Sequence, residues 1–396
     1  MSCSGGTSSN RTPTTGTATV GGPVREIAQD RLDPWIELDP AAFRSNLEFL
    51  AERSRKPIAA VVKCNGYGLD HRVVGPLLDP APQVACFAVV TVEEALELRS
   101  SGVRKPILLM GDFMASAEME LADSDITLAV YTPDAPQRLA AMAEKTGRPV
   151  KVHPYIDTGF HRLGMDVRKS GPWVMELAAS PAVEITGTMT ELTQEGDFDK
   201  EQIRRFAEFG RTMAEKGVKL GPMHAAASDA IIKHPEGVFD MIRPGNLIYG
   251  IPANPADDEA ARPVRVAFRM QARVIRVVEL TQGETLGYNR GFAPDLDTDV
   301  AVIKCGRTAG YVYRGGEGKA VALINGKTYP LVSDINSSHC YADLGKNHGV
   351  ERLDEVTLIG PEEGLRPQDL ARVTGRSRYE SFNIHTSVPK IVVGVR

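Results

Sequence analysis

Short apolar runs alternate with helix-like segments from Pro34 to about Pro263. Most of the runs are apolar on both faces, and an amphipathic segment follows each, which is typical of a parallel sheet buried under helices. About eight such units in about 230 residues fit a (β/α)8 barrel. A doubly wound sheet is the structural alternative, but no GxGxxG motif follows an early strand. The clearest runs are residues 58–62, 86–90, 107–110, 128–131 and 150–152, and the clearest helix-like segments are 91–101, with a capping-box pattern at its start, and 136–145.

The pattern changes after Pro263, where alternating β-branched segments separated by turns replace the helical ones. We therefore predict a barrel over residues 31–265 and a second, mostly antiparallel β domain over residues 266–396. Residues 1–30 begin with a Ser/Thr/Gly-rich stretch and are expected to form a disordered leader. Residues 35–38 form an isolated strand that is expected to pair with the β domain. The expected strands of that domain are 269–280, 299–304, 319–324, 327–332 and 356–359, with helix signals nearly absent.

Composition and charge restrict the possible partners. A net charge of −5, with no cluster of Lys and Arg free of acids, gives no reason to expect nucleic acid. No apolar run approaches the ~18 residues of a membrane helix. The five cysteines are odd in number and lack a CxxC pair, which argues against disulfides or structural zinc and for a cytoplasmic location. A small-molecule substrate or another protein is the expected partner.

A lysine that ends an apolar strand is the first candidate for chemistry. Lys63 follows the run 58–62, and the strand direction carries it to the face of a barrel where active sites lie. A half-buried amine at this place can form an imine with an aldehyde. By position alone, the alternative is a lysine whose amine only reaches solvent at a strand end.

Several motifs then resemble those of the alanine racemase family. Residues 60–68 (AVVKCNGYG) resemble its cofactor-lysine motif, and residues 153–164 (HPYIDTGFHRLG) are similar to its DTG-x-x-RLG segment. Residues 224–228 and 239–250 (FDMIRPGNLIYG) are similar to its phosphate-side and arginine motifs. The resemblance continues from 266–288 to VPK at 388–390, so that only the first 30 or so residues lie outside it.

The resemblance implies pyridoxal 5′-phosphate, held as a Schiff base by Lys63. It implies that Arg162 lies near the phenolic oxygen of the cofactor and the substrate carboxylate, and that Arg243 pairs with the pyridine nitrogen. An arginine cannot accept a proton, so the ring is a weaker electron sink and a carbanion on the substrate is short-lived. The implied phosphate contacts are Tyr67, Ser228 and the amides of Gly245 and Asn246, with Thr386 where the family usually has a tyrosine.

Four positions depart from the family pattern, all in one half of the implied site. Arg307 stands where racemases have a tyrosine as the second base, and Glu191 where a histidine supports that tyrosine. Tyr155 replaces a lysine that is often carbamylated, and residues 337–338 (SS) replace a Met-Asp pair. We interpret Glu191 and Arg307 as a rewired pair in which Arg307 binds an anionic group of the substrate.

The alternative is that Tyr311 or Tyr313 supplies the missing phenol.

The resemblance predicts a homodimer in which each site takes Arg307 from the partner, with Lys63, Arg307 and Glu191 as candidate catalytic residues. The first functional hypothesis is an amino-acid racemase or epimerase with a non-standard substrate. The second is a one-sided enzyme of the same fold, such as a decarboxylase, a lyase or aldolase, or a biosynthetic exchange enzyme. The third is a non-catalytic cofactor-binding protein, although such proteins usually lack a β domain.

Overall fold

The structure is a computed structural model that describes residues 33–313 and 320–394. The leader predicted for residues 1–30 lies outside the described residues, and so does the start of the strand predicted at 319. The described residues form one compact unit by their contacts.

Parallel strands form the first part of this unit, as the alternating pattern predicts. Six of them lie in chain order in one sheet, and a further pair continues it. The peptide groups of residues 57–61 and 242–244 bond to one another and join the last segment to the first strand, which closes the ring. The strands are β2 (Ile58–Val61), β3 (Val84–Val89), β4 (Ile107–Leu109), β5 (Ile126–Val130), β6 (Val150–Pro154), β9 (Val183–Ile185), β10 (Thr188–Met189) and β11 (Met223–His224).

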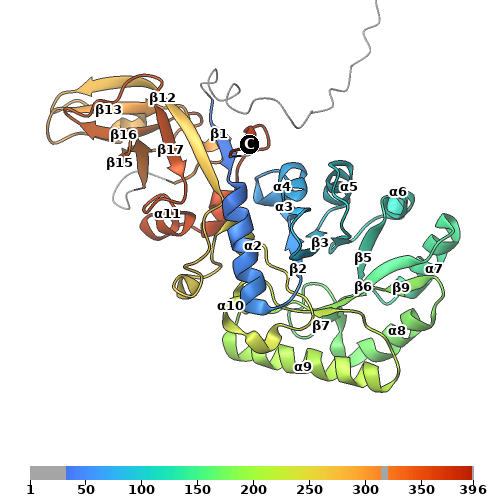
Figure 1. Ribbon diagram of the computed structural model, residues 1–396. Helices are drawn as coiled ribbons and strands as arrows, with labels where there is room; N and C mark the ends of the chain where they lie inside the picture. The colour runs from blue at the N-terminus through green and yellow to red at the C-terminus, as the bar shows by residue number, and fades with distance from the viewer. Residues whose placement is uncertain (1–32, 314–319, 395–396) are drawn as a thin grey trace, which may run out of the picture. The chain divides into compact units, whose positions relative to one another are not determined.

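Helices cover the outside of these strands (Figure 1). Helix α5 begins at the capping box predicted from the sequence, in which the hydroxyl of Thr91 accepts the amide of Glu94. The helices are α2 (Pro40–Ser54), α4 (His71–Leu78), α5 (Val92–Ser100), α6 (Glu118–Asp123), α7 (Ala135–Thr146), α8 (Val167–Ala179), α9 (Gly196–Glu215) and α10 (Ser228–Lys233). The short parallel pair of β7 (Ile156–Asp157) and β8 (Met165–Asp166) precedes α8.

Apolar residues are buried on both faces of the barrel strands, because successive residues of a strand face opposite sides. Ala60 faces outward into the large core beneath the helices, whereas Val61 faces the interior of the ring. The innermost layer at the carboxyl end of the strands consists of Val61, Ala88, Leu108, Ala129, Tyr155 and Met189. A filled interior leaves the strand ends and their loops as the place for a site.

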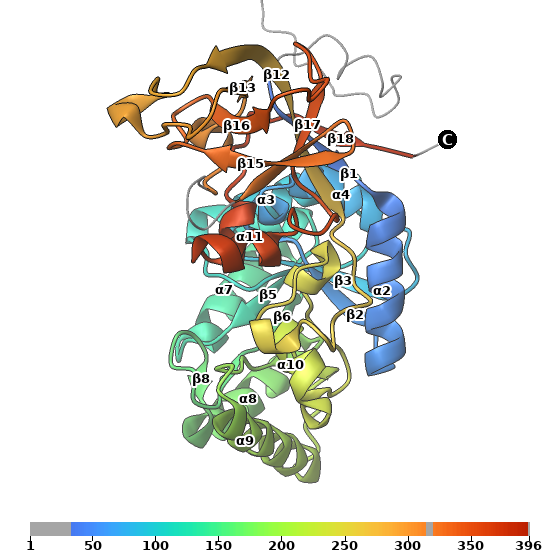
Figure 2. The same cartoon turned by 90° about the vertical axis from the view of Figure 1, so that its left-hand side faces the viewer.

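The second part is the predicted β domain, whose strands form a sheet of their own (Figure 2). The order is β13-β16-β15-β14-β17-β12-β1-β18, and an additional β12–β13 pairing closes it. The isolated strand β1 (Trp35–Leu38) pairs antiparallel with β12, which confirms its expected place. The strands are β12 (Phe268–Leu280), β13 (Thr298–Ile303), β14 (Val321–Ile324), β15 (Lys327–Val332), β16 (Cys340–Gly345), β17 (Glu355–Ile359) and β18 (Lys390–Val392).

Two strands and one α-helix of this domain are not among the predicted elements. Strands β16 and β18 lack a long β-branched run, and they are defined by pairing with β13 and β1. The prediction that helix signals nearly vanish is wrong for α11 (Pro367–Thr374), which begins with proline at its first position and ends at Gly375 with φ 67°.

Among the described helices, none is long and apolar enough to cross a membrane.

Candidate active site

Lys63 lies at the carboxyl end of β2, on a turn with unusual backbone geometry. The next four residues, Cys64 to Tyr67, have φ between 55° and 60°, so α3 (Lys63–Tyr67) contains a left-handed turn. Residues other than glycine rarely adopt this conformation, and it persists where surrounding contacts impose it. The carboxylate of Glu94 accepts the amide of Asn65 at 3.0 Å while it also caps α5. Lys63 itself is half-buried and makes no hydrogen bond or ion pair with the described residues.

Loops at the carboxyl ends of the barrel strands surround a cavity of about 550 Å³ beside Lys63. Residues from α10 onward and from the end of the β domain complete its wall. Most of the predicted site residues line it, namely Lys63, Tyr67, Arg162, Glu191, Ser228, Arg243, Gly245 and Asn246. The structure therefore brings together residues that are almost 200 positions apart in the sequence.

Arg243 is buried, and other groups already occupy its terminal nitrogens. Its Nη1 donates to Nδ1 and to the carbonyl oxygen of His224, both at 2.8 Å. Its Nη2 donates to the carbonyl oxygen of Thr190 at 2.6 Å and to Oε2 of Glu191 at 2.9 Å. The Nε–H group is thus the donor that remains for a ligand, which fits an acceptor such as the pyridine nitrogen.

The contact with Arg243 defines the tautomers of two buried histidines. Because a guanidinium only donates, Nδ1 of His224 accepts, and its Nε2–H donates to Nδ1 of His153 at 2.9 Å. Burial and the charge of Arg243 lower the pKa of His153 to about 4 and that of His224 well below its usual value. Both rings are neutral at pH 7, so the guanidinium is held by uncharged acceptors on this side.

Glu191 holds two arginines of this site. Its carboxylate contacts Nη2 of Arg243 at 2.9 Å and Nη2 of Arg162 at 4.0 Å. This carboxylate already has cationic partners within its own chain, and its predicted pairing with Arg307 stays a prediction. Its side chain is 24% exposed, which leaves part of it open to the cavity.

The opposite end of the cavity suits a phosphate group. The hydroxyl oxygen of Ser228 accepts the amides of Gly245 at 3.1 Å and Leu247 at 3.4 Å. A Cβ on Gly245 would lie 2.1 Å from the hydroxyl of Tyr67, so only glycine allows this approach. Burial raises the pKa of Tyr67, whose phenol therefore remains a hydrogen-bond donor. The hydroxyls of Tyr67 and Ser228 and the amide of Asn246 lie beside Lys63 in the cavity lining, and this set of donors fits the phosphate and the aldehyde of pyridoxal phosphate.

Thr386 does not belong to this cavity, which corrects the predicted phosphate contact. It is exposed, whereas Tyr379 of η7 (Arg378–Phe382) lines the wall near Tyr67. Arg378 fixes η7 to the barrel through Asp258, with Nη1 at 2.6 Å and Nη2 at 3.0 Å from its carboxylate oxygens. The two aromatic residues within 379–382, which begin seven positions before Thr386, are the sequence feature that could have indicated this part of the cavity wall.

Arg307 does not line the cavity of its own chain either. It begins η6 (Arg307–Ala309), is exposed, and makes no ion pair with the described residues. Its amide donates to the carbonyl oxygen of Asn336, and the amide of Thr308 donates to that of Ser337. The four departures thus separate into two places, with Glu191 and Tyr155 in the cavity and Arg307 and residues 337–338 on the β domain.

The alternative that Tyr311 or Tyr313 supplies a phenol to this site is wrong for the described chain. Both side chains are completely buried in the core of the β domain, where their rings contact each other. Burial raises the pKa of both phenols, which opposes a role as a base. Either ring would have to leave its core to reach a substrate.

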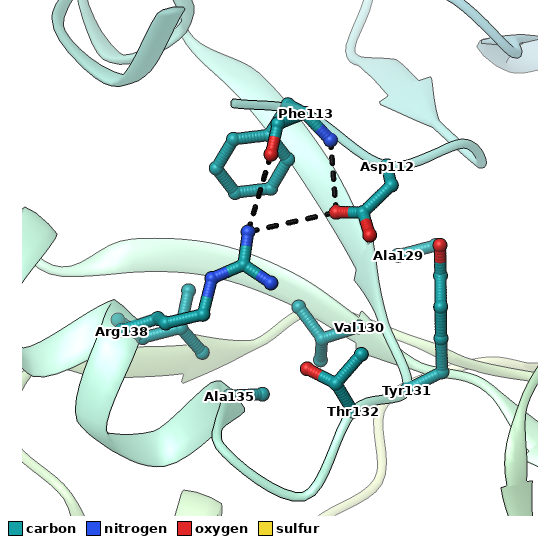
Figure 3. A pocket seen from close by; sticks show the side chains of 9 residues that line it. Asp112, Phe113, Ala129, Val130, Tyr131, Thr132, Ala135 and Arg138 are labelled. Carbon is teal, nitrogen blue, oxygen red and sulfur yellow. Dashed lines mark hydrogen bonds and ion pairs between the residues drawn. The ribbon is translucent and has the colours of Figure 1, made fainter. Parts of the chain in front are cut away.

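A second pocket lies beside the ends of β4 and β5, but its charged groups satisfy one another (Figure 3). Arg138 lies 3.5 Å from the carboxylate of Asp112 and donates to the carbonyl oxygen of Phe113 at 3.2 Å. Its guanidinium also stacks over the ring of Phe113. The charged groups that line this second pocket are therefore paired with each other. Its residue Tyr131 packs against the ring of Tyr155, which lines the main cavity.

A closed parallel barrel with a lysine at a strand end, a cradle of amides and hydroxyls for phosphate, and an appended antiparallel β domain defines a fold-type III pyridoxal-phosphate enzyme. Comparison with known proteins agrees with this class. Residues 38–253 match the family described as "Alanine racemase, N-terminal domain", and residues 267–392 match "Alanine racemase, C-terminal domain". The chain belongs to the alanine racemase family and is a pyridoxal-phosphate-dependent, racemase-like isomerase.

Individual relatives cover nearly the whole chain. The alanine racemase of Desulforamulus reducens is 29% identical over 370 residues, which are 91% of this chain and 99% of that protein. The alanine racemase of Clostridium novyi is 28% identical over 91% of this chain and 95% of its own length. Among solved structures, the alanine racemase from D-cycloserine-producing Streptomyces lavendulae has a TM-score of 0.84 with 26% identity, and covers 92% of this chain and 98% of its own.

Proposed function

We propose that this enzyme racemises or epimerises an amino acid other than alanine. The observation that carries the proposal is the contrast between two halves of the site. The lysine and most of the predicted phosphate contacts line one cavity. By the resemblance, in contrast, Arg307 stands at the position of the family's second base and Glu191 at the position of the residue that supports that base. An arginine is a poor base at neutral pH but a good partner for an anionic group on a substrate.

The chain's own residues have distinct tasks in this proposal. Pyridoxal phosphate supplies an electron-withdrawing ring that acidifies the Cα–H bond of an attached amino acid. Lys63 holds the cofactor and moves the proton on one face of Cα through Nζ. Tyr67, Ser228, Tyr379 and the amide of Asn246 would hold the phosphate, with the Ser228 hydroxyl oriented by the amide of Gly245, and the Nε–H group of Arg243 would be the donor for the ring nitrogen. Arg162 binds the substrate carboxylate.

We further propose that the enzyme is a homodimer and that each site receives Arg307 from the partner. The exposure of Arg307 and its lack of an ion pair with the described residues support this. A cytoplasmic location is also proposed, supported by the free thiols of the described cysteines Cys64, Cys86, Cys305 and Cys340.

A one-sided enzyme of the same fold is the second candidate. The burial of Tyr311 and Tyr313 favours it, because these phenols are then not available as a second base. Lys63 alone would move protons in that case, and the configuration at Cα would be retained.

One experiment separates the two candidates. The purified enzyme is incubated in D2O with a panel of L- and D-amino acids that includes acidic and hydroxylated ones, and Cα deuterium and configuration are measured. Racemisation predicts deuterium together with loss of configuration for a substrate other than alanine. Deuterium with retained configuration assigns the one-sided reaction. Rapid racemisation of alanine would show that the argument from the missing base is wrong.

A further inference from the structure

The hydroxyl of Tyr155 is a polar group that the fold leaves unsatisfied at the candidate site. Tyr155 follows β6 and is 3% exposed, and its ring lies in the inner layer of the barrel, where Ala88 and Ala129 leave room for it. The ring lines the cavity, yet its buried hydroxyl has no partner at hydrogen-bonding geometry among the described residues. Phenylalanine would fill the same space, so the fold does not depend on a hydrogen bond donated by this O–H group.

The charged neighbours of this hydroxyl indicate what it meets. The charges of Arg162 and Glu191 act on this hydroxyl, and so does the charge of Arg243, which is paired with Glu191. Burial and, to a lesser extent, the charge of Glu191 raise the pKa of Tyr155 to about 12, while the charges of Arg243 and Arg162 and the approach of the Arg162 guanidinium as a hydrogen-bond donor oppose this. The phenol is therefore protonated at neutral pH and is available as a donor.

Arg162 supplies further donors next to the phenol. Its guanidinium stacks over the ring of Phe160 at 4.3 Å, and the carboxylate of Asp157 holds this loop by accepting the amides of residues 159–161. The side chain is 55% exposed, and Glu191 contacts only one of its nitrogens, at 4.0 Å. A guanidinium and a phenol O–H that converge on one cavity are matched to an anion with two oxygens, which is a carboxylate.

We propose that Tyr155 is a substrate-binding residue whose hydroxyl donates a hydrogen bond to the carboxylate of the amino-acid substrate, beside Arg162. The assignment rests on the proposed function, because it takes an amino acid as the substrate. It deepens that function by placing a carboxylate donor within the same chain, at one of the positions where this sequence departs from its family.

The test uses propionate, a carboxylate without an amino group that cannot react with the cofactor. The holoenzyme is titrated with propionate while the absorbance of the bound cofactor is followed, and propionamide serves as the uncharged probe. Tyr155→Phe is expected to raise the Kd for propionate about 10- to 100-fold, because a hydrogen bond to a charged group is lost. Tyr131→Phe is the matched control. The ring of Tyr131 packs against that of Tyr155, with the ring centroids 6.2 Å apart, but Tyr131 does not line the cavity. It should bind propionate as the wild type does.

A second measurement distinguishes binding from a structural role. Because the hydroxyl is unsatisfied without a ligand, Tyr155→Phe should leave the Tm of the propionate-free enzyme unchanged or raise it. An unchanged Kd for propionate in Tyr155→Phe overturns the proposal, as does equal binding of propionamide. A lowered Tm with loss of cofactor would assign the hydroxyl to the fold instead. Covalent attachment of the cofactor to Lys63 and exchange of the substrate Cα–H for deuterium by the wild type test the proposed function separately, because neither measures this hydrogen bond.

Discussion

At the scale of single residues, chemistry in this site depends on which donors and charges remain unpaired. Arg243 has both terminal nitrogens occupied by His224, Thr190 and Glu191, which leaves Nε–H for the cofactor. Lys63 is the amine left without a partner among the described residues of the same cavity. A site is thus defined here by the groups that the fold does not satisfy.

Replacement of Lys63 by alanine should abolish covalent attachment of the cofactor and turnover, because no other lysine lines the described cavity. Borohydride reduction of the wild type should attach the cofactor to the peptide that contains Lys63, as peptide mass spectrometry can measure. An unchanged absorbance spectrum of the cofactor in Lys63→Ala would contradict the assignment.

Glu191→Gln should leave the cofactor bound but lower turnover about 10- to 100-fold. The substitution keeps a similar shape but removes the negative partner of Arg243. Loss of one partner of a partly buried ion pair costs free energy, because the other charge is left without its partner. Cofactor absorbance and kcat against KM provide the readouts, with Glu191→Asp as a partial rescue. Glu208→Gln, which breaks an exposed pair with Arg204, is the control and should change nothing. Equal turnover in Glu191→Gln and wild type would show that the contact with Arg243 is dispensable.

Acid should destabilise the fold through His153 and His224. Their pKa values are lowered in the folded protein, to about 4 for His153, whereas unfolded histidine titrates near ~6.5. Their contribution to the free energy of unfolding is therefore complete above pH ~6.5 and falls as the pH drops toward 4, by about 1.4 kcal/mol per pH unit for each ring. Urea unfolding between pH 7 and 5 measures the slope. Ring signals in NMR should stay those of neutral imidazoles down to pH 5. Titration of either ring near pH 6.5 would disprove the hydrogen bonds by which Arg243 donates to His224 and His224 donates to His153.

At the scale of elements, the loops that follow the barrel strands position the site. The turn after β2 is left-handed over Cys64–Tyr67 and is held by Glu94, which caps α5. The loop before η3 (Asn246–Tyr249) approaches Tyr67 so closely that position 245 has no room for a side chain. Two elements from separate parts of the barrel thus form one phosphate cradle.

Gly245→Ala tests this approach. The new methyl group would lie 2.1 Å from the hydroxyl of Tyr67, and such overpacking costs roughly 1–3 kcal/mol. Cofactor affinity should fall about 10- to 100-fold, as titration of the apoenzyme with pyridoxal phosphate can measure. Gly196→Ala is the control, because a Cβ there meets nothing within 4 Å. Similar affinities for both variants would mean that the cradle is looser than the contact implies.

At the scale of the whole molecule, the barrel and the β domain share more than a linker. Strand β1 precedes the first barrel helix but pairs with β12 and β18, and Tyr379 returns from the C-terminal part to line the barrel cavity. The division at residues 265 and 266 therefore remains a prediction about domains, even though the two architectures are distinct. Arg307 is presented on the surface of the β domain, away from the cavity lining of its own chain.

A shared site in a homodimer predicts complementation between subunits. Lys63→Ala and Arg307→Ala homodimers should each be inactive on the true substrate. Heterodimers contain one site with both native residues and should regain up to about half of the wild-type turnover per dimer. Activity of tagged, purified heterodimers is the measurement. Arg307→Ala should keep the cofactor absorbance of the wild type. Verified heterodimers without activity would exclude a site shared in this way.

The sequence by itself determined the barrel, the β domain, Lys63 and the set of residues around it, because buried parallel strands and compact motifs leave a local pattern. The departures from the family pattern at Glu191, Arg307, Tyr155 and residues 337–338 remain predictions from the sequence. Only the tertiary structure decided that Glu191 holds Arg243, that Tyr379 rather than Thr386 lines the cavity, and that Tyr311 and Tyr313 are buried. The physical reason is that a local pattern reports which face of an element is buried, whereas partners across a barrel depend on how distant strands and loops meet. A hydroxyl such as that of Tyr155 is recognised as unsatisfied only when every neighbour is in place.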